Sequence, residues 1–218
     1  KFWKKKKVLI TGHTGFKGGW LSLILSYLNC NVYGYALAPV GINNFFNNIK
    51  IKKIFKKDIR KNIINNKEIN KNIKKIKPEI IFHLAAQSSV IESFKNSKNT
   101  ILTNVLGTAN IIEAVKNNSS VKCLIIITTD KVYQNYKTRK HFDENSTLGG
   151  DDIYSGSKAC CEILTNSYAK SFFQNNKLCR IVTVRAGNCF GGGDWTKDRI
   201  VKDALESFYK NKNLILRN

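Results

Sequence analysis

Short apolar runs alternate with helical repeats along this chain. The first run, at residues 8–10, leads into three glycines spaced three residues apart. The apolar residues that follow recur at the spacing of one helix face, which predicts that this face packs on a sheet: Trp20, Leu21, Ile24, Leu25 and Leu28. We therefore expect a strand, a tight turn and a helix near the start of the sequence.

The same alternation continues through the middle of the chain. Further strands are predicted at residues 31–37, 80–86 and 123–128, and another short apolar stretch precedes Asp58. The helical faces between them are Ile69, Ile73 and Ile76, ended by Pro78, and then Ile101, Val105, Thr108, Ile112 and Val115. Strands and helices in alternation predict an α/β fold with a doubly wound parallel sheet. Its ligand crevice should lie at the carboxyl ends of the strands.

Composition changes this picture little. The 218 residues suffice for one large domain, or for one domain and the beginning of another. The 37 Lys+Arg exceed the 15 Asp+Glu, but the chain also contains 26 Asn and 26 Ile, so the excess reflects a general bias rather than a nucleic-acid patch. The most basic segment, residues 50–77, contains a single aromatic residue, Phe55, and reads as a solvated face.

The spacing of the cysteines and the length of the apolar runs indicate the cellular compartment. Six cysteines form no C-x-x-C pair and no metal-ligand spacing with the three histidines, so we expect reduced, mostly buried thiols and no metal. No apolar run has the length of a membrane span, and residues 1–7 lead directly into the first strand. We therefore expect a cytoplasmic protein without membrane or nucleic-acid partners. The chain starts at Lys1 and stops at Asn218, so a fragment is one interpretation.

The glycine turn is the first candidate site. Gly12, Gly15 and Gly18 let the backbone turn sharply and approach a phosphate, which the N-terminus of the next helix would attract. A glycine corner without a ligand is the alternative. The second strand ends at Tyr35, Ala36 and Leu37 without the acid that usually holds the adenosine ribose, so Asp58 is the next acid that could approach an adenine. An ordinary loop carboxylate is the other interpretation of Asp58.

A histidine in an apolar run and a tyrosine–lysine pair lead to different predictions. His83 lies inside an apolar run and reads as a hydrogen-bonded core histidine rather than a catalyst. Tyr154 and Lys158, four residues apart after Gly149 and Gly150, should share one helix face. A nearby ammonium stabilises a phenolate and lowers the pKa of tyrosine from about 10, which would make Tyr154 a usable general base.

These motifs together resemble the extended short-chain dehydrogenase/reductases and, within them, the sugar-nucleotide 4,6-dehydratases. The resemblance is carried by residues 12–18, 83–87, 103–108 and 185–188 and by Tyr154 with Lys158. Residues 13–18, 129–131, 191–195 and 198–199 are similar, more narrowly, to the dehydratases that act on CDP-glucose. Ile153 and Lys202 stand where proline is usual.

The resemblance implies an internal redox cycle over bound NAD. Tyr154 would take the proton of the sugar 4-hydroxyl, Thr129 would bond that oxygen, and Lys158 would hold the nicotinamide ribose. Asp130 would protonate the departing 6-hydroxyl, and Lys131 or a neighbour would remove the C5 proton. A charge that binds substrate is the alternative role of Lys131.

The resemblance also assigns the binding residues. NAD would be held by Gly12, Thr14, Gly15, Phe16, Lys17, Gly18, Asp58, Ile59, Leu84, Ala85, Ala86, Gln87, Tyr154 and Lys158. The nucleotide sugar, CDP-glucose by the narrower similarity, would contact Gln87, Asn188, Asp194, Trp195 and Arg199.

The family pattern further implies the organisation of the chain. Residues 1–190 would form the NAD-binding domain, and residues 191–218 would begin a substrate-binding region whose remainder is absent. A homodimer or larger homo-oligomer, serving polysaccharide biosynthesis, is expected. A 4-epimerase or reductase would share the cofactor loop, Tyr154 and Lys158 without needing Asp130 and Lys131, and a non-catalytic NAD-binding protein is the third interpretation.

Overall fold

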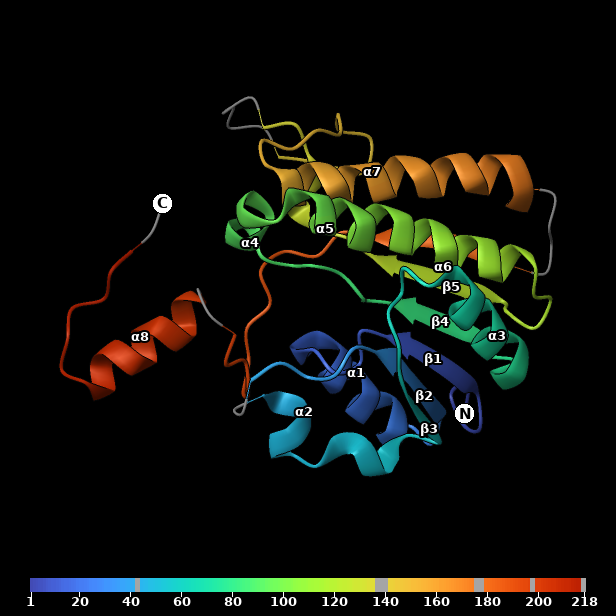
Figure 1. The fold of residues 1–218 in the computed structure, drawn as a ribbon, viewed down its shortest axis with the longest axis horizontal. Helices are drawn as coiled ribbons and strands as arrows, with labels where there is room; N and C mark the ends of the chain where they lie inside the picture. The colour runs from blue at the N-terminus through green and yellow to red at the C-terminus, as the bar shows by residue number, and fades with distance from the viewer. Residues whose placement is uncertain (42–43, 136–140, 175–178, 197–198, 217–218) are drawn as a thin grey trace.

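A computed structural model describes residues 1–41, 44–135, 141–174, 179–196 and 199–216. Its centre is a six-stranded, all-parallel sheet in the order β3-β2-β1-β4-β5-β6 (Figure 1). The strands are β1 (Lys7–Thr11), β2 (Asn31–Ala36), β3 (Lys57–Arg60), β4 (Ile80–His83), β5 (Cys123–Ile127) and β6 (Arg180–Val184). The strand order reverses between β1 and β4, so the predicted doubly wound sheet is confirmed and its crevice opens above these two strands.

Helices cover both faces of the sheet. They are α1 (Phe16–Tyr27), α2 (Phe45–Asn48), α3 (Asn66–Ile76), α4 (Val90–Lys95), α5 (Ser97–Ile101), α6 (Gly107–Lys116), α7 (Ile153–Tyr168) and α8 (Ile200–Tyr209). Short 3-10 turns lie at Ile51–Ile54 and Asp130–Val132, and π-helical turns at Leu102–Leu106 and Ala169–Phe173. Figure 1 shows α3, α6 and α7 along one side of the sheet and α1 and α2 along the other.

Two apolar clusters hold these layers together. On one face, the buried sides of α3 and α6 pack on Leu9, Ile81 and Leu124. On the other face, Leu25 of α1 packs on a second set of strand residues: Val8, Ile10, Val32 and Ile80. Parallel strands that are covered on both faces need apolar side chains at successive positions, which is why the strands read as continuous apolar runs. The predicted α3 face is confirmed, since Ile69, Ile73 and Ile76 are all buried.

The packing face predicted for α1 is wrong in part. Trp20, Ile24 and Leu28 are exposed to 41%, 52% and 38%. The face that approaches the sheet consists instead of Gly18, Gly19, Ser22 and Leu25. Small residues let the helix lie close to the glycine turn, and this close approach displaces the larger apolar side chains to the outside. Trp20 is used differently: it stacks on Phe45 at 5.0 Å between ring centroids.

The predicted face from Ile101 to Val115 is also changed. A π-helical turn at Leu102–Leu106 joins α5 to α6 and shifts the helical register by its wider winding. Thr108, Ile112 and Val115 are buried as predicted, whereas Ile101 is 47% exposed. Asn104, within the π turn, is buried in its place.

Two expectations concerned the burial of the cysteines and the absence of membrane spans. All six cysteines are free, and only half of them, Cys30, Cys161 and Cys179, are buried, so the expectation of mostly buried thiols holds in part. Within the described ranges, no helix has both the length and the apolar character needed to cross a bilayer.

The end of the chain differs from the rest. Helix α8 has no buried residue, although Ile200, Leu205 and Phe208 are large and apolar. Figure 1 shows α8 beside the sheet and its covering helices rather than among them. The packing therefore changes after β6.

Candidate active site

The glycine turn lies at the point where the strand order reverses. Gly12 has φ +74°, and a Cβ there would lie 2.7 Å from the backbone nitrogen of Ala85, after β4. A Cβ on Gly18 would lie 2.3 Å from the Gly12 carbonyl oxygen. Both positions exclude a side chain, so the backbone forms a narrow cradle between β1, α1 and β4. Helix α1 begins at Phe16 with Gly15 as its N-cap and without a side-chain cap, which suits an anionic group at this end.

Asp58 lies in β3 and not in a loop, so it is not an ordinary loop carboxylate. His13 Nε2 lies 2.9 Å from Asp58 Oδ1, and Arg60 Nη2 lies 2.7 Å from Asp58 Oδ2. His13 is fully buried, and that burial lowers its pKa, so the imidazole is neutral and Nε2–H donates to the carboxylate. Both carboxylate oxygens are thus bonded within the protein, and the approach of Asp58 to an adenine stays a prediction. Ile59 beside it is 7% exposed.

Arg60 brings a charge to the end of β2 that the sequence pattern did not reveal. Its Nη1 donates to the Leu37 carbonyl oxygen at 3.1 Å, and its guanidinium lies 4.6 Å from the Phe46 ring centroid. Thr14 reaches the same carbonyl oxygen at 3.2 Å. The end of β2 therefore carries a cation, although Asp58 offsets its charge.

Gln87 is turned away from the crevice. Its amide nitrogen donates to the Ser89 carbonyl oxygen and to Thr100 Oγ1, both at 2.9 Å, and its amide oxygen accepts from the Ser89 backbone nitrogen. Asn104 fixes the backbone of Gln87 through two further hydrogen bonds. The Gln87 side chain therefore braces its own loop, and its predicted contacts with the cofactor and the substrate stay predictions. The backbone atoms of Leu84 and Ala85 approach Gly12 most closely.

The predicted catalytic residues meet at the end of β5. The Thr129 hydroxyl donates to Asp130 Oδ1 at 3.0 Å, and its interaction with the Tyr154 phenol acts to lower the pKa of that phenol. Lys158 Nζ donates to the Ile127 carbonyl oxygen at 2.7 Å, and its charge interacts with that of Lys17 from the glycine turn. Tyr154 and Lys158 lie on one face of α7, which Asp152 caps at 3.0 Å from the Ser155 nitrogen. The structure therefore groups Thr129, Tyr154, Lys158 and Asp130.

The electrostatics of this group correct one expectation. Burial raises the pKa of Tyr154, whereas the Thr129 hydrogen bond and the Arg199 charge act in the opposite direction. The expected lowering of the Tyr154 pKa by Lys158 is not found, since the Lys158 ammonium donates to a backbone carbonyl of β5. Burial also lowers the pKa of Lys158, which favours its neutral form more than in water.

Asp130 and Lys131 lie at the mouth of the crevice. Both are exposed, and both belong to the 3-10 turn that follows β5. Asp130 is anchored by its backbone nitrogen, which donates to the Ala186 carbonyl oxygen at 3.1 Å. A Cβ on Gly187 would lie 3.7 Å from Asp130 Oδ2, so the carboxylate faces the segment after β6.

His83 is a core histidine, as predicted. It is 2% exposed, with Nδ1 2.7 Å from Thr11 Oγ1 and Nε2 3.2 Å from Thr108 Oγ1. Burial lowers the pKa of His83 to about 3, so the ring stays neutral and ties β4 to β1 and α6.

The glycine loop at residues 191–195 closes over α1. Trp20 Nε1 donates to the Gly192 carbonyl oxygen at 3.1 Å, and a Cβ on Gly193 would meet the Phe45 ring at 2.3 Å. Arg199 Nε lies 3.8 Å from Asp194 Oδ2, and the Arg199 charge reaches Tyr154. Trp195, the last residue of this loop, and Asn188, which precedes the loop, are both exposed. Asp198 lies outside the described residues. Arg199 and Asp194 are thus brought to the catalytic group from the far end of the chain.

Three residues of the surrounding framework are not predicted individually by any sequence pattern. His13 and Arg185 belong to longer motifs, and Glu162 belongs to none. Glu162 follows Lys158 by four residues, so helical spacing alone could have placed it on the same face. No local pattern could have paired it with Arg185.

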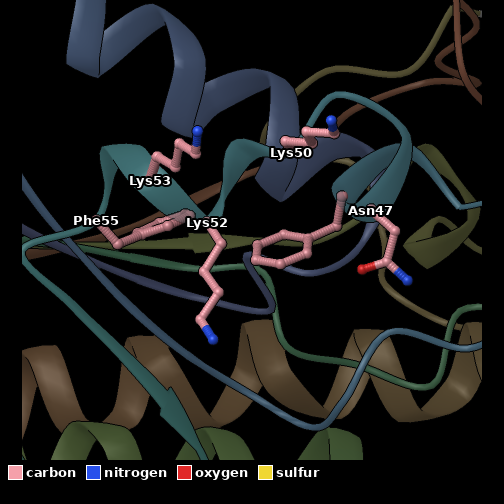
Figure 2. Close-up of a pocket in the computed structure, with 6 residues that line it drawn as sticks. Asn47, Lys50, Lys52, Lys53 and Phe55 are labelled. Carbon is pink, nitrogen blue, oxygen red and sulfur yellow. The ribbon is translucent and has the colours of Figure 1, made fainter.

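A separate hollow of about 580 Å³ lies between α2 and the 3-10 turn at Ile51–Ile54. It is lined by Phe46, Asn47, Lys50, Lys52, Lys53 and Phe55. Figure 2 shows the Lys52 ammonium directed to one side and those of Lys50 and Lys53 to the other, so the charges do not converge on one ligand. None of the catalytic residues named above lines it.

Known proteins are similar to this chain in sequence. A family model described as GDP-mannose 4,6 dehydratase matches residues 9–189. The CDP-glucose 4,6-dehydratase of Salmonella typhimurium is 40% identical, over 100% of this chain and 61% of that protein.

Solved structures agree on the fold. The dTDP-glucose 4,6-dehydratase of Bacillus anthracis, in complex with NAD, matches with a TM-score of 0.78 and 24% identity over 96% of this chain and 63% of that one. The UDP-glucuronic acid 4-epimerase of Bacillus cereus, in complex with UDP-glucuronic acid and NAD, matches with a TM-score of 0.80 and 23% identity over 95% and 64%. The chain spans less than two thirds of the length of each of these relatives.

Proposed function

We propose that this chain, which belongs to the GDP-mannose 4,6 dehydratase family of extended short-chain dehydrogenase/reductases, is the NAD-binding part of a sugar-nucleotide 4,6-dehydratase. The observation that carries the proposal is the grouping of Asp130 with Thr129, Tyr154 and Lys158 at the end of β5. Oxidation needs the last three residues, and elimination of water needs an added acid. CDP-glucose is the proposed substrate, on the basis of the Salmonella typhimurium relative.

The cradle fits a dinucleotide. Gly12 and Gly18 leave room for a pyrophosphate where a Cβ would clash with backbone, and the N-terminus of α1 faces the same space. Lys17 and Lys158 place positive charge nearby. When bound, NAD supplies the acceptor and then the donor of one hydride.

Tyr154 and Thr129 would begin the reaction. The phenolic oxygen accepts the proton of the sugar 4-hydroxyl, and Thr129, which interacts with the phenol, holds that oxygen in line. Arg199 stabilises the phenolate by its charge. Loss of hydrogen from C4 leaves a 4-keto group, which acidifies the C5 proton.

Asp130 would then act as the general acid. It gives its proton to the departing 6-hydroxyl, while Lys131 removes the C5 proton or holds the substrate by its charge. Both side chains are exposed toward the space above β5, where a substrate can reach them. Hydride return to C6 completes a cycle in which nothing is oxidised overall.

A tracer experiment tests this function. CDP-glucose deuterated at C4, given to the full-length protein with catalytic NAD, should yield a 4-keto-6-deoxy sugar with deuterium at C6 and solvent hydrogen at C5. Mass spectrometry and NMR locate the label. An epimerase, the alternative that shares Tyr154 and Lys158, would return the label to C4, and a simple dehydrogenase would leave it in released NADH. Either of these results would reject the dehydratase function.

Cofactor choice is tested separately. We expect tighter binding of NAD than of NADP, because Tyr35 and Ala36 offer no cation and Asp58 already offsets the charge of Arg60. Isothermal titration calorimetry with both cofactors measures the difference. Tighter binding of NADP, lost in Arg60→Ala, would show that Arg60 is free to receive a 2′-phosphate.

The proposed domains follow the change of packing after β6. Residues 1–190 form the NAD-binding domain, and residues 191–218 begin the substrate-binding region. The apolar side chains of α8, none of which is buried, would pack within that region. A cytoplasmic location is proposed with this function, because nucleotide sugars and NAD are shared metabolites of that compartment.

A homodimer is proposed from the outer face of the helical layer. Ile101, Leu106, Ile153 and Ile163 are all 38% or more exposed on α5, α7 and the π turn between α5 and α6. Exposed apolar side chains on neighbouring helices favour association with a second copy. Sedimentation equilibrium should give twice the chain mass, and Ile163→Lys should shift the equilibrium to monomer. A monomeric parent protein would reject the dimer.

A further inference from the structure

The catalytic face of α7 extends one turn past Lys158. Tyr154, Lys158 and Glu162 follow one another at intervals of four residues and so lie on the same side of the helix. Glu162 is 5% exposed. A carboxylate is seldom buried this deeply unless several donors satisfy it, and the mechanism above leaves Glu162 without a role.

Glu162 joins three elements through its two oxygens. Oε1 accepts a hydrogen bond from the Thr128 hydroxyl, at the end of β5. Oε2 accepts from Thr183 Oγ1 at 2.7 Å and from Arg185 Nη2 at 3.2 Å, at and just beyond the end of β6. One buried side chain thus fixes α7, β5 and β6 relative to one another.

Arg185 carries the connection outward to the segment that follows the catalytic turn. Its Nη1 donates to the carbonyl oxygens of Asp143 at 3.4 Å and Glu144 at 3.2 Å. Its guanidinium lies 5.0 Å from the ring centroid of Tyr133, and that ring stacks on Phe142 at 4.7 Å. The guanidinium therefore fixes Tyr133 and residues 143–144, which follow Asp130 and Lys131 in the chain.

We propose that Glu162 and Arg185 are a positioning pair for the acid and base turn at Asp130 and Lys131. The turn is anchored on one side by Thr128, which Glu162 holds, and on the other by Tyr133, which Arg185 holds. This inference rests on the proposed dehydratase function.

The two halves of the reaction depend on this pair to different extents. Lys158 is held by the Ile127 carbonyl oxygen, and Tyr154 is held by its burial in α7. Neither contact involves Glu162, whose charge is the smallest of the influences on the Lys158 pKa. Asp130 and Lys131 are exposed, so the anchors on both sides of the turn determine where they lie. Loss of the pair should therefore slow elimination more than oxidation.

The test uses Glu162→Gln in the full-length protein. The amide has nearly the same shape but presents an NH₂ group where one oxygen accepted hydrogen bonds. In a single turnover with CDP-glucose, the rate at which reduced nicotinamide appears should stay within about threefold of the parent, while its disappearance should slow by about tenfold to a hundredfold, as for a misplaced catalytic group. Reduced cofactor should therefore accumulate, and its absorbance reports both rates.

Two further variants keep the test decisive. Thr128→Val removes the hydroxyl bonded to Glu162 at nearly constant volume and should give the same accumulation, whereas Thr128→Ser should restore the parent pattern. Glu113→Gln is the control, because Glu113 likewise accepts hydrogen bonds from a cationic side chain, Lys116, and from a hydroxyl, that of Tyr168, but lies on α6 away from the turn. It should leave both rates unchanged.

Two outcomes would overturn the proposal. If both rates fall by the same factor in Glu162→Gln and Thr128→Val, the pair supports the fold generally and does not position the turn. If both rates stay at the parent values, the pair has no role in catalysis. Failure of the dehydratase function itself would appear differently, because the parent protein would then give no 4-keto-6-deoxy product.

Discussion

Replacing Tyr154 with phenylalanine is expected to lower kcat by about a hundredfold to ten-thousandfold while leaving NAD affinity unchanged. The substitution removes the phenolic oxygen, on which Thr129 acts. It keeps the aromatic ring of this α7 residue, and the parent Tyr154 is only 9% exposed. Steady-state kinetics in the full-length protein, with NAD affinity from calorimetry, measure the two effects. Because burial raises the pKa of Tyr154, the parent rate should rise with pH as the phenolate forms, and this rise should be absent in the variant.

A second tyrosine on the same helix provides the control. Tyr168 donates from its hydroxyl to Glu113 Oε1 at 2.8 Å, two turns beyond Glu162 and outside the crevice. Tyr168→Phe removes an equivalent oxygen and should leave kcat within about twofold, since general-base catalysis is untouched. A Tyr154→Phe enzyme that is as active as this control would show that another residue takes the proton.

Adding one methyl group at Gly18 should have the second largest effect. In Gly18→Ala the new Cβ would lie 2.3 Å from the Gly12 carbonyl oxygen and 2.8 Å from the His13 Cα, so backbone must move. Overpacking of this kind costs about 1–3 kcal/mol of stability. It also opens the turn that approaches the pyrophosphate, so NAD affinity should fall by about tenfold or more, the equivalent of about 1.4 kcal/mol. Thermal unfolding and calorimetry measure the two quantities.

A helix glycine with free space is the matched control. A Cβ on Gly156 would meet no atom within 4 Å. Gly156→Ala should therefore stabilise the protein by about 0.5–1 kcal/mol through helix propensity and leave NAD affinity unchanged. Similar behaviour of the two variants would mean that the close contacts at Gly18 do not control the turn.

Each short-range signal in the sequence has a physical cause that does not depend on the rest of the chain. Apolar runs predict strands because a parallel sheet covered on both faces buries successive side chains, and β1, β2 and β4 were found this way. The glycine spacing and the four-residue spacing of Tyr154 and Lys158 likewise follow from backbone and helix geometry. The family resemblance added the roles of Thr129 and Asp130, which no spacing alone could give.

Faces of helices were less predictable than the helices themselves. For α3 the apolar stripe and the buried face coincide, because the sheet is flat and apolar beneath it. For α1 the close approach required by the glycine turn selected Gly18, Gly19 and Ser22, and the apolar stripe faced outward. For α5 and α6 a π turn shifted the register. In both failures, a backbone constraint outweighed the burial of larger side chains.

The sequence by itself determined the doubly wound sheet, the glycine turn and the placement of Tyr154 and Lys158 on one helix face, because these depend on local spacing and on the period of apolar residues. Only the tertiary structure decided which charges meet. It paired Asp58 with His13 and Arg60, it turned Gln87 into its loop, and it buried Glu162 against Arg185. These partners lie between 2 and 45 residues apart. Their interaction depends on distance and burial in the folded chain, and neither quantity is encoded in a residue pattern.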